Sequence, residues 1–420
     1  MALASLILRR SLALPLLFVL SSLLATAGAR ADDAPPAGLR ISGFGTLGYV
    51  HSNESQADYS ASALNPGTAG ASKVWSPDVD SRLGVQADWL LDAQWSAVLQ
   101  LVAERSLQNG YAPQLEWANL KYRVSPELDL RLGRIALPLL LVGDYRKLGY
   151  ALPWVRPPVE LYGSIPITSS DGIDANYRWA SGEITHITQL FYGHADVPFK
   201  PTARAKAQAM TGLSHIATLG SLSVRLSAMT TRISANLAPE LFDGLQQSGA
   251  AGVLLARRYA LDNARTGTAA LGFSYDTCDW FLTGEAASMV SHSVLGHRSA
   301  AYLSGGLRLG DWTPYLAYAI ARPNSAIADA GLALDGFDGV ALVRRAQLNA
   351  GLNAMLATIP HQHSVTTGVR WDVASNYALK LQYERLIPVT GTRGTLIHTQ
   401  PGFRAGHAIG VLSVALDLVF

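Results

Sequence analysis

The sequence predicts an all-β fold, a transmembrane antiparallel up-and-down β-barrel of about 16 strands. Strand-like segments are joined alternately by very short and long polar links, as in a barrel with tight turns on one side of a bilayer and loops on the other. The 420 residues are 49% hydrophobic but only 15% charged, against roughly 25% charged in ordinary soluble domains. Beyond the N-terminus, no stretch approaches the roughly 18 uncharged apolar residues of a membrane-spanning helix. The apolar residues are therefore dispersed, as alternation along strands would disperse them.

Sixteen segments have the length and alternation of strands, an even number as in single-chain bacterial barrels. They are 39–50, 81–91, 95–105, 114–124, 128–139, 171–179, 183–193, 206–219, 222–234, 264–277, 279–290, 298–309, 312–323, 362–374, 377–388 and 406–420. The short links are rich in Gly, Asp, Asn, Ser and Pro, which form tight turns readily. The long links are 51–80, 140–170, 195–205, 235–263, 323–361 and 389–405, with shorter ones at 106–113 and 291–297. Two of them contain helical patterns, one starting at Pro239 and one around 340–350.

The N-terminus has the features of a secretory signal peptide over residues 1–31. Arg9 and Arg10 precede an apolar core, and Ala29-Arg30-Ala31 resembles a cleavage site. The mature chain, residues 32–420, is then predicted to form the barrel. Cleavage removes three arginines and no acid, which changes the formal charge from +2 to −1. This near-neutral charge gives no argument for a nucleic-acid partner. Cys278 is the single cysteine, so an intramolecular disulfide and a thiolate metal cluster are excluded.

Within each strand the two faces differ chemically. In the last strand, Leu412, Val414, Leu416, Leu418 and Phe420 share one face, whereas Ser413 and Asp417 share the other. Side chains alternate across a strand, so one face suits lipid and the other suits water. Aromatic residues near the short turns fall on the apolar face, where an interfacial belt is expected. These residues are Trp89, Trp95, Tyr122, Trp179, Tyr275, Trp280, Trp312, Trp371 and Tyr377. The alternative is that these rings form the core of a soluble sandwich.

Several segments resemble the porins of the Gram-negative outer membrane. They are the terminal strand Gly410–Phe420, the first strand Ile41–Tyr49, the pair Gly368–Asp372 with Ala378–Arg385, and the run Arg131–Arg134. The resemblance implies a water-filled channel in the cell outer membrane for small hydrophilic solutes, with no cofactor. It further implies a homotrimer and a C-terminal Phe that contributes to recognition by the barrel-assembly machinery. The Pro-Glu-Phe-Gly-Gly loop motif of the general porins is absent, so the family does not define the constriction here.

Segment 140–170 is the predicted constriction loop, folded into the lumen as in the porins that the chain resembles. Its apolar residues, among them Trp154 and Leu161, offer anchors, and four prolines stiffen it. An anchored, stiff loop could narrow a pore. The alternative is an external loop packed on its neighbours or on another protomer.

A channel needs a polar wall and a constriction that sets its charge preference. Strand parity and the loop together predict twelve pore-lining or constriction residues. They are Arg82, Lys121, Arg123, Asp129, Arg131, Arg134, Arg146, Arg156, Glu160, Asp174, Arg178 and Arg370. The excess of basic groups suggests a weak anion preference, with pairing across strands as the alternative. Alternation breaks at Gly133, so Arg134 either sits at a bulge or faces differently.

Three alternatives to a general pore remain. The second candidate is a substrate-selective channel for organic or aromatic acids, because the constriction loop carries aromatic and Arg residues. An outer-membrane hydrolase is less favoured because neither a Gly-x-Ser-x-Gly nor a His-Glu-x-x-His motif occurs. His361 and His363 could suggest a metal site, but a solvated surface explains them better. An adhesin would use the long loops as its binding surface.

Overall fold

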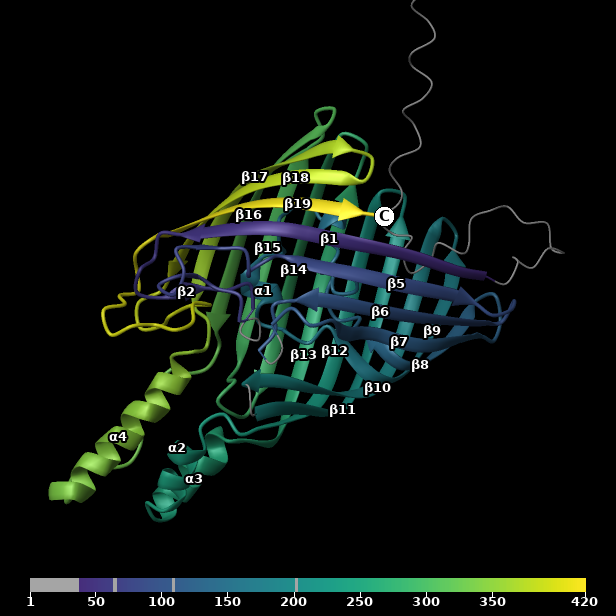
Figure 1. The fold of residues 1–420 in the computed structure, drawn as a ribbon. Coiled ribbons are helices and arrows are strands. Elements are labelled where there is room, and N and C mark those ends of the chain that lie inside the picture. Colours follow the sequence, from purple (N-terminus) through teal and green to yellow (C-terminus); the bar gives the residue numbers. More distant parts are fainter. Residues whose placement is uncertain (1–37, 63–65, 108–109, 201–202) are drawn as a thin grey trace, which may run out of the picture.

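The computed structural model describes residues 38–62, 66–107, 110–200 and 203–420. In this part of the chain, sixteen long antiparallel strands close into a barrel (Figure 1). The strands are β1 (Gly38–Ser52), β5 (Arg82–Leu90), β6 (Trp95–Glu104), β7 (Gln114–Arg123), β8 (Leu128–Ala136), β9 (Ser169–Ser181), β10 (Ile184–Lys200), β11 (Ala203–Leu219), β12 (Leu222–Ala235), β13 (Leu261–Asp276), β14 (Trp280–Ser291), β15 (Arg298–Leu307), β16 (Trp312–Pro323), β17 (Gln362–Ala374), β18 (Tyr377–Pro388) and β19 (Ile409–Val419). The predicted fold class and all sixteen predicted strands are confirmed. The predicted signal peptide, residues 1–31, lies outside the described residues.

The barrel closes between its first and last strands. β1 pairs with β19 on one edge and with β5 on the other, so the sheet has no free long edge. Gly43 and Phe420 exchange two backbone hydrogen bonds, of 2.9 and 3.0 Å. Closure lets the first and last strands pair with each other as the inner strands do, and a bilayer core requires such pairing of backbone groups within the protein. The C-terminal phenylalanine thereby takes part in the closure of the barrel.

The two ends of the barrel differ as the alternation of the links predicts. Tight turns at one end contain Gly182 and Gly220, whose φ angles of 60° and 55° suit glycine. At the other end, the first long loop holds the short strands β2 (Asp58–Tyr59), β3 (Ala69–Gly70) and β4 (Trp75–Ser76). Two more loops hold α2 (Pro239–Gln246), α3 (Ala250–Tyr259) and α4 (Gly339–Leu356), which extend beyond the barrel (Figure 1). Both predicted helices are present, and α3 was not predicted.

One predicted link is wrong. Segment 195–205 was expected to be a loop, but β10 continues to Lys200 and β11 begins at Ala203. Asp196 and Lys206 are register partners in this extension, and Arg204 Nε lies 2.6 Å from Asp196 Oδ1. Small alanines alternate with charged residues in this part of β11, and register shifts at Gly193/Ala195, Pro198/Lys200 and Gln208/Thr211 interrupt the two-residue repeat, so the segment has the composition of a polar link.

The outer wall carries the apolar face of the strands. Leucines there are strongly exposed, among them Leu226, Leu271 and Leu316. The nine predicted belt aromatics are exposed or half-buried, and several pair across strands. Trp312 and Trp371 stack with ring centroids 4.9 Å apart, and Trp95 and Tyr122 lie 4.6 Å apart. An interfacial belt on the outer wall is therefore confirmed, and the sandwich-core alternative is wrong. Among the described helices, none is both long and apolar enough to span a bilayer.

Replacing Leu271 by Arg tests which face contacts lipid. Leu271 is 55% exposed on the outer wall of β13, and a guanidinium at mid-bilayer depth costs about 2–4 kcal/mol. We expect Leu271→Arg to lower the free energy of unfolding by that amount in a urea titration of protein in lipid vesicles. Ser274→Arg on the lumenal face of the same strand is the matched control and should change little. Equal losses for both variants would contradict this assignment of faces.

Candidate functional site

The segment between β8 and β9, residues 137–168, is here called the inner loop. Near its start it is fixed to the lumenal face of β12 and β14. Arg225 of β12 donates to Leu140 O at 2.5 Å and pairs with Asp144 at 2.9 Å. The Leu141 N–H donates to Glu285 of β14 at 2.6 Å. Both wall residues occupy inward positions, so the inner loop enters the lumen directly after β8.

The middle of the inner loop is fixed to a second part of the wall, β17 to β19. Lys380 of β18 is fully buried and its Nζ donates to Gly149 O at 2.6 Å and Trp154 O at 2.9 Å. The same ammonium pairs with Asp417 of β19 at 2.7 Å. Arg370 of β17 donates to Tyr150 O at 2.5 Å. Contacts with β12 to β14 and with β17 to β19 mean that the inner loop crosses the lumen.

A third wall also holds the inner loop. Lys147 Nζ lies 2.6 Å from Glu104 of β6 and 2.8 Å from Glu116 of β7. Burial favours the neutral amine, but the two carboxylates outweigh this and raise the pKa of Lys147. The ammonium is therefore charged and fixes this part of the loop directly to β6 and β7.

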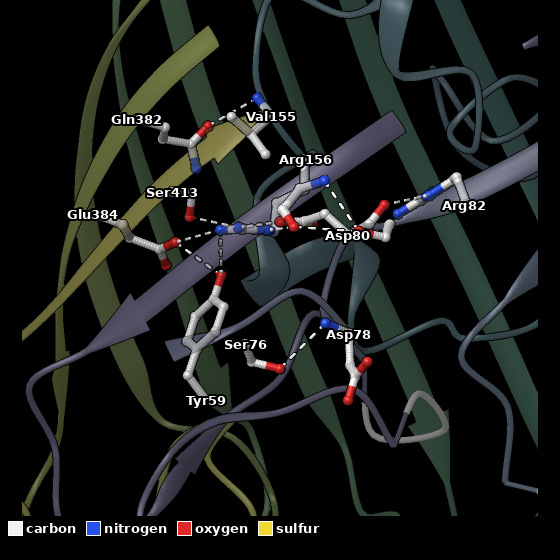
Figure 2. A network of polar contacts seen from close by, with 12 residues as sticks. Tyr59, Ser76, Asp78, Asp80, Arg82, Val155, Arg156, Gln382, Glu384 and Ser413 are labelled. Atoms are coloured by element: carbon white, nitrogen blue, oxygen red, sulfur yellow. Dashed lines mark hydrogen bonds and ion pairs between the residues drawn. The ribbon is translucent and has the colours of Figure 1, made fainter. Parts of the chain in front are cut away.

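Arg156 lies at the centre of a buried network (Figure 2). Its guanidinium donates to Asp80 at 2.9 and 2.5 Å, to Tyr59 Oη at 3.1 Å and to Ser413 Oγ at 2.6 Å. Glu384 Oε2 is 3.8 Å away and accepts from Tyr59 at 2.9 Å. Burial opposes the charge, yet Asp80 and its neighbours hold the pKa of Arg156 well above its usual value. Arg156 therefore joins the first long loop, the inner loop and the wall.

Two predicted pore-lining residues, Arg156 and Glu160, are buried instead. Arg156 was expected to line the pore, but it is only 5% exposed and its donors are used by the protein. Glu160 is fully buried in the short helix α1 (Val159–Tyr162) and accepts from Gln362 Nε2 at 2.8 Å. Its other oxygen has no partner in the described part of the chain, and burial raises the pKa of this carboxyl. Neither group offers its charge to a solute in the pore.

Arg146 and Arg370 also serve the inner loop. Arg146 Nη1 donates to Ile165 O at 2.8 Å and to Tyr162 O at 3.3 Å, which ties the two halves of the loop together. Burial lowers the pKa of Arg146. Arg370 pairs with Asp372 at 2.7 Å and donates to loop carbonyls. Their donors hold the loop in place, so these two predicted constriction residues act on the shape of the constriction.

The inner loop packs its apolar side against one part of the wall. Trp154 lies edge-on to Tyr302 of β15, with centroids 5.8 Å apart, and its Nε1 donates to Ser304 at 2.9 Å. Tyr162 donates to Glu285 at 2.7 Å. The buried cluster contains Leu140, Val142, Leu152, Trp154, Leu161, Tyr162, Ala270, Phe281, Tyr302, Tyr315 and Ala319. The loop thus packs against β13 to β16, and within the described residues its ion pair with β7 is at Glu116. The inward arginines of β7 to β9 that lie closer to the short turns stay partly exposed.

Six predicted residues come together on the lumenal face of β7, β8 and β9. This lumenal basic cluster consists of Lys121, Arg123, Asp129, Arg131, Asp174 and Arg178 on β7, β8 and β9. Lys121, Arg131 and Asp174 form one register row, and Arg123 lies opposite Asp129 in the next. Four cations and two carboxylates leave a formal excess of two positive charges.

The cluster is partly paired and partly open. Arg131 binds Asp174 through two nitrogens, at 2.9 and 2.5 Å, and Arg178 lies 2.6 Å from Asp129. Arg123 is 3.6 Å from the same carboxylate, and Lys121 forms no ion pair within the described residues. The three arginine side chains remain 23–38% exposed. Water and solutes can reach them, which distinguishes this cluster from Arg156.

The last two predicted residues differ in position. Arg82 lies inside the barrel, opposite Glu104, and its Nε donates to Asp80 O at 3.1 Å. Arg134 faces outward, because the register of β8 continues without a bulge and Leu132, two residues earlier, is 63% exposed on the outer wall. Arg134 pairs there with Asp171 at 2.7 Å. The prediction that Arg134 lines the pore is therefore wrong, and the alternative orientation is correct.

The solved structures that resemble this one include porins and channels of the outer membrane. The anion-selective porin of Comamonas acidovorans is 14% identical, with a TM-score of 0.52, over 92% of this chain and 100% of that one. The outer-membrane channel DcaP of Acinetobacter baumannii is 11% identical, with a TM-score of 0.54, over 91% and 97%. Salmonella typhi OmpF, solved with daunomycin, is 11% identical, with a TM-score of 0.53, over 92% and 100%.

Comparison of the sequence alone finds no relative. No family model matches, and no curated protein matches. The likeness therefore lies in the fold, and the chemistry of the lumen has to be read from this chain's own residues. With a closed barrel of sixteen strands and an apolar, aromatic-belted outer wall, the chain has the fold of the outer-membrane porins.

Proposed function

We propose that this chain is an outer-membrane porin through which small hydrophilic solutes diffuse passively, with a weak preference for anions. The observation that carries the proposal is the lumenal basic cluster, whose arginine side chains lie on the inner face of β7 to β9 and remain partly exposed. A polar wall keeps a solute hydrated, and an excess of fixed positive charge raises the local concentration of anions. The predicted homotrimer and recognition by the barrel-assembly machinery belong to the same proposal.

The preference is weak because carboxylates compensate half of the cluster. Asp129 and Asp174 together neutralise two of four cations. Most other lumenal cations bind loop carbonyls or carboxylates, as Lys380 and Lys147 do. A lumen of this kind differs from one lined by unpaired charges of one sign, in which selectivity would be strong.

Planar-bilayer recording of the purified protein tests the proposal. We expect stepwise insertion of open channels and a reversal potential, in a tenfold KCl gradient, that corresponds to a chloride permeability a few times that of potassium. Liposome swelling with small sugars checks passage of neutral solutes. Absence of both conductance and swelling would refute the channel, and clear potassium selectivity would refute the anion preference.

A further inference from the structure

Arg298, at the start of β15, is a lumenal cation without an acidic partner. Its register partner Met289 is buried on the lumenal face, so Arg298 points inward as well. Its Nη2 donates to Ser164 O at 2.8 Å and lies 3.5 Å from Met289 Sδ. Among the described residues, no carboxylate lies within ion-pair distance of it. A guanidinium has five N–H donors, so most of its hydrogen-bonding capacity remains unused.

A small cavity lies beside this guanidinium. It has room of about 20 Å³, enough for one or two waters, and is partly open. Arg298, Met289 and Thr268 line it as one register row across β15, β14 and β13. Leu161 and Ile165 of the inner loop cover the row. The cavity thus has a cationic end, a neighbouring hydroxyl and otherwise mostly apolar walls.

The surroundings of Arg298 contrast with those of three other inward arginines. Arg131, Arg156 and Arg225 each bind an aspartate at 2.9 Å or less. An unpaired cation in an apolar setting is costly, and an anion that binds it removes much of that cost. Only Arg298 of these four combines a missing carboxylate with adjacent empty space.

We propose that this cavity binds the carboxylate group of a small organic acid on its way through the lumen. One carboxylate accepts two parallel N–H bonds from a guanidinium, a pairing stronger than neutral hydrogen bonds. The Thr268 hydroxyl can donate a third bond, and the apolar walls suit the hydrocarbon part of the acid. The absence of a second cation disfavours a doubly charged phosphate, since Arg298 alone would face it. This inference rests on the proposed channel function and names its preferred solute class.

Fluorine NMR of trifluoroacetate with the detergent-solubilised protein tests binding without requiring conduction. We expect the wild type to broaden the signal, with an affinity about tenfold weaker for Arg298→Gln, or about 1.4 kcal/mol. Arg322→Gln is the matched control, since Arg322 is the register partner of Ser299 and faces outward on the neighbouring strand. Equal broadening by wild type and Arg298→Gln would overturn the proposal, and so would displacement by chloride at equal concentration.

A second variant separates binding from loop support, because Arg298→Gln also removes the bond to Ser164. Ala287 lines the cavity, so Ala287→Leu should fill it and abolish the broadening while Arg298 keeps its contacts. Retained binding in Ala287→Leu would overturn the cavity as the site. Heat-modified migration in SDS gels verifies that each variant is folded. Conductance without Arg298-dependent binding refutes this inference alone, and binding without conductance refutes the channel alone.

Discussion

Replacement of Arg156 by Gln should release the inner loop and enlarge the channel. The guanidinium is buried against Asp80 and lies 3.8 Å from Glu384, so its loss leaves two buried carboxylates without their cation. Breaking one side of a buried ion pair costs about 3–5 kcal/mol. The backbone hydrogen bonds between the strands keep the barrel folded without Arg156. The lost free energy therefore destabilises the attachment of the loops that Arg156 joins. We expect single-channel conductance to rise clearly above that of the wild type.

Trypsin provides a second measurement of the same effect. Arg146 and Lys147 lie in the inner loop and are held by hydrogen bonds to the loop and the wall, so the wild type should resist cleavage there. Arg156→Gln should be cut at these positions under native conditions.

Two control variants test whether the buried ion pair causes this effect. The double variant Arg156→Gln/Asp80→Asn removes both charges and should recover part of the resistance to trypsin. Lys73→Gln, which breaks an exposed pair with Asp78 in the first long loop, should cost at most about 1 kcal/mol. Wild-type conductance and resistance in Arg156→Gln would contradict the role assigned to Arg156.

The sequence predicts the barrel wall far better than the lumen. Two-residue alternation and turn composition locate each strand because both are local properties of the chain. The same logic assigns Lys121 and Arg131 to the inner face correctly. It fails at 195–205, because the apolar residues of β11 there are only alanines and because register shifts interrupt the two-residue repeat of both strands.

Loop charges cannot be assigned in this way. Arg156 and Asp80 are 76 residues apart, and their pairing depends on how two loops meet inside a closed barrel. Nothing near Arg156 in the sequence distinguishes a guanidinium that faces water from one that is buried. Arg298 was missed for a similar reason, because its cavity forms only when Leu161 and Ile165 of the inner loop lie over three wall strands. Local pattern predicts which face a strand residue takes, and tertiary contact decides whether its charge is free.

Reversal of two charges in the lumenal basic cluster should abolish the anion preference. Lys121→Glu/Arg123→Glu changes the formal charge of the cluster from +2 to −2. Each unit charge about 10 Å from the ion path contributes roughly 0.4 kcal/mol in water, so four units amount to about 1.7 kcal/mol, or more than tenfold in the chloride-to-potassium permeability ratio. We expect the reversal potential to change sign in dilute KCl.

Two controls accompany this charge reversal: the KCl concentration is varied, and the same charge change is made on the outer face of the barrel. The Debye length is about 30 Å at 0.01 M and 3 Å at 1 M, so the difference from wild type should be large in dilute salt and nearly vanish in molar salt. Arg204→Glu/Lys206→Glu makes the same charge change on β11, where both residues are exposed and Lys206 is next to inward-facing, buried Ala207. These two positions lie on the outer face, so that variant should keep the wild-type reversal potential. If both double variants shifted the potential equally, the net charge of the protein would set the preference and the lumenal basic cluster would not.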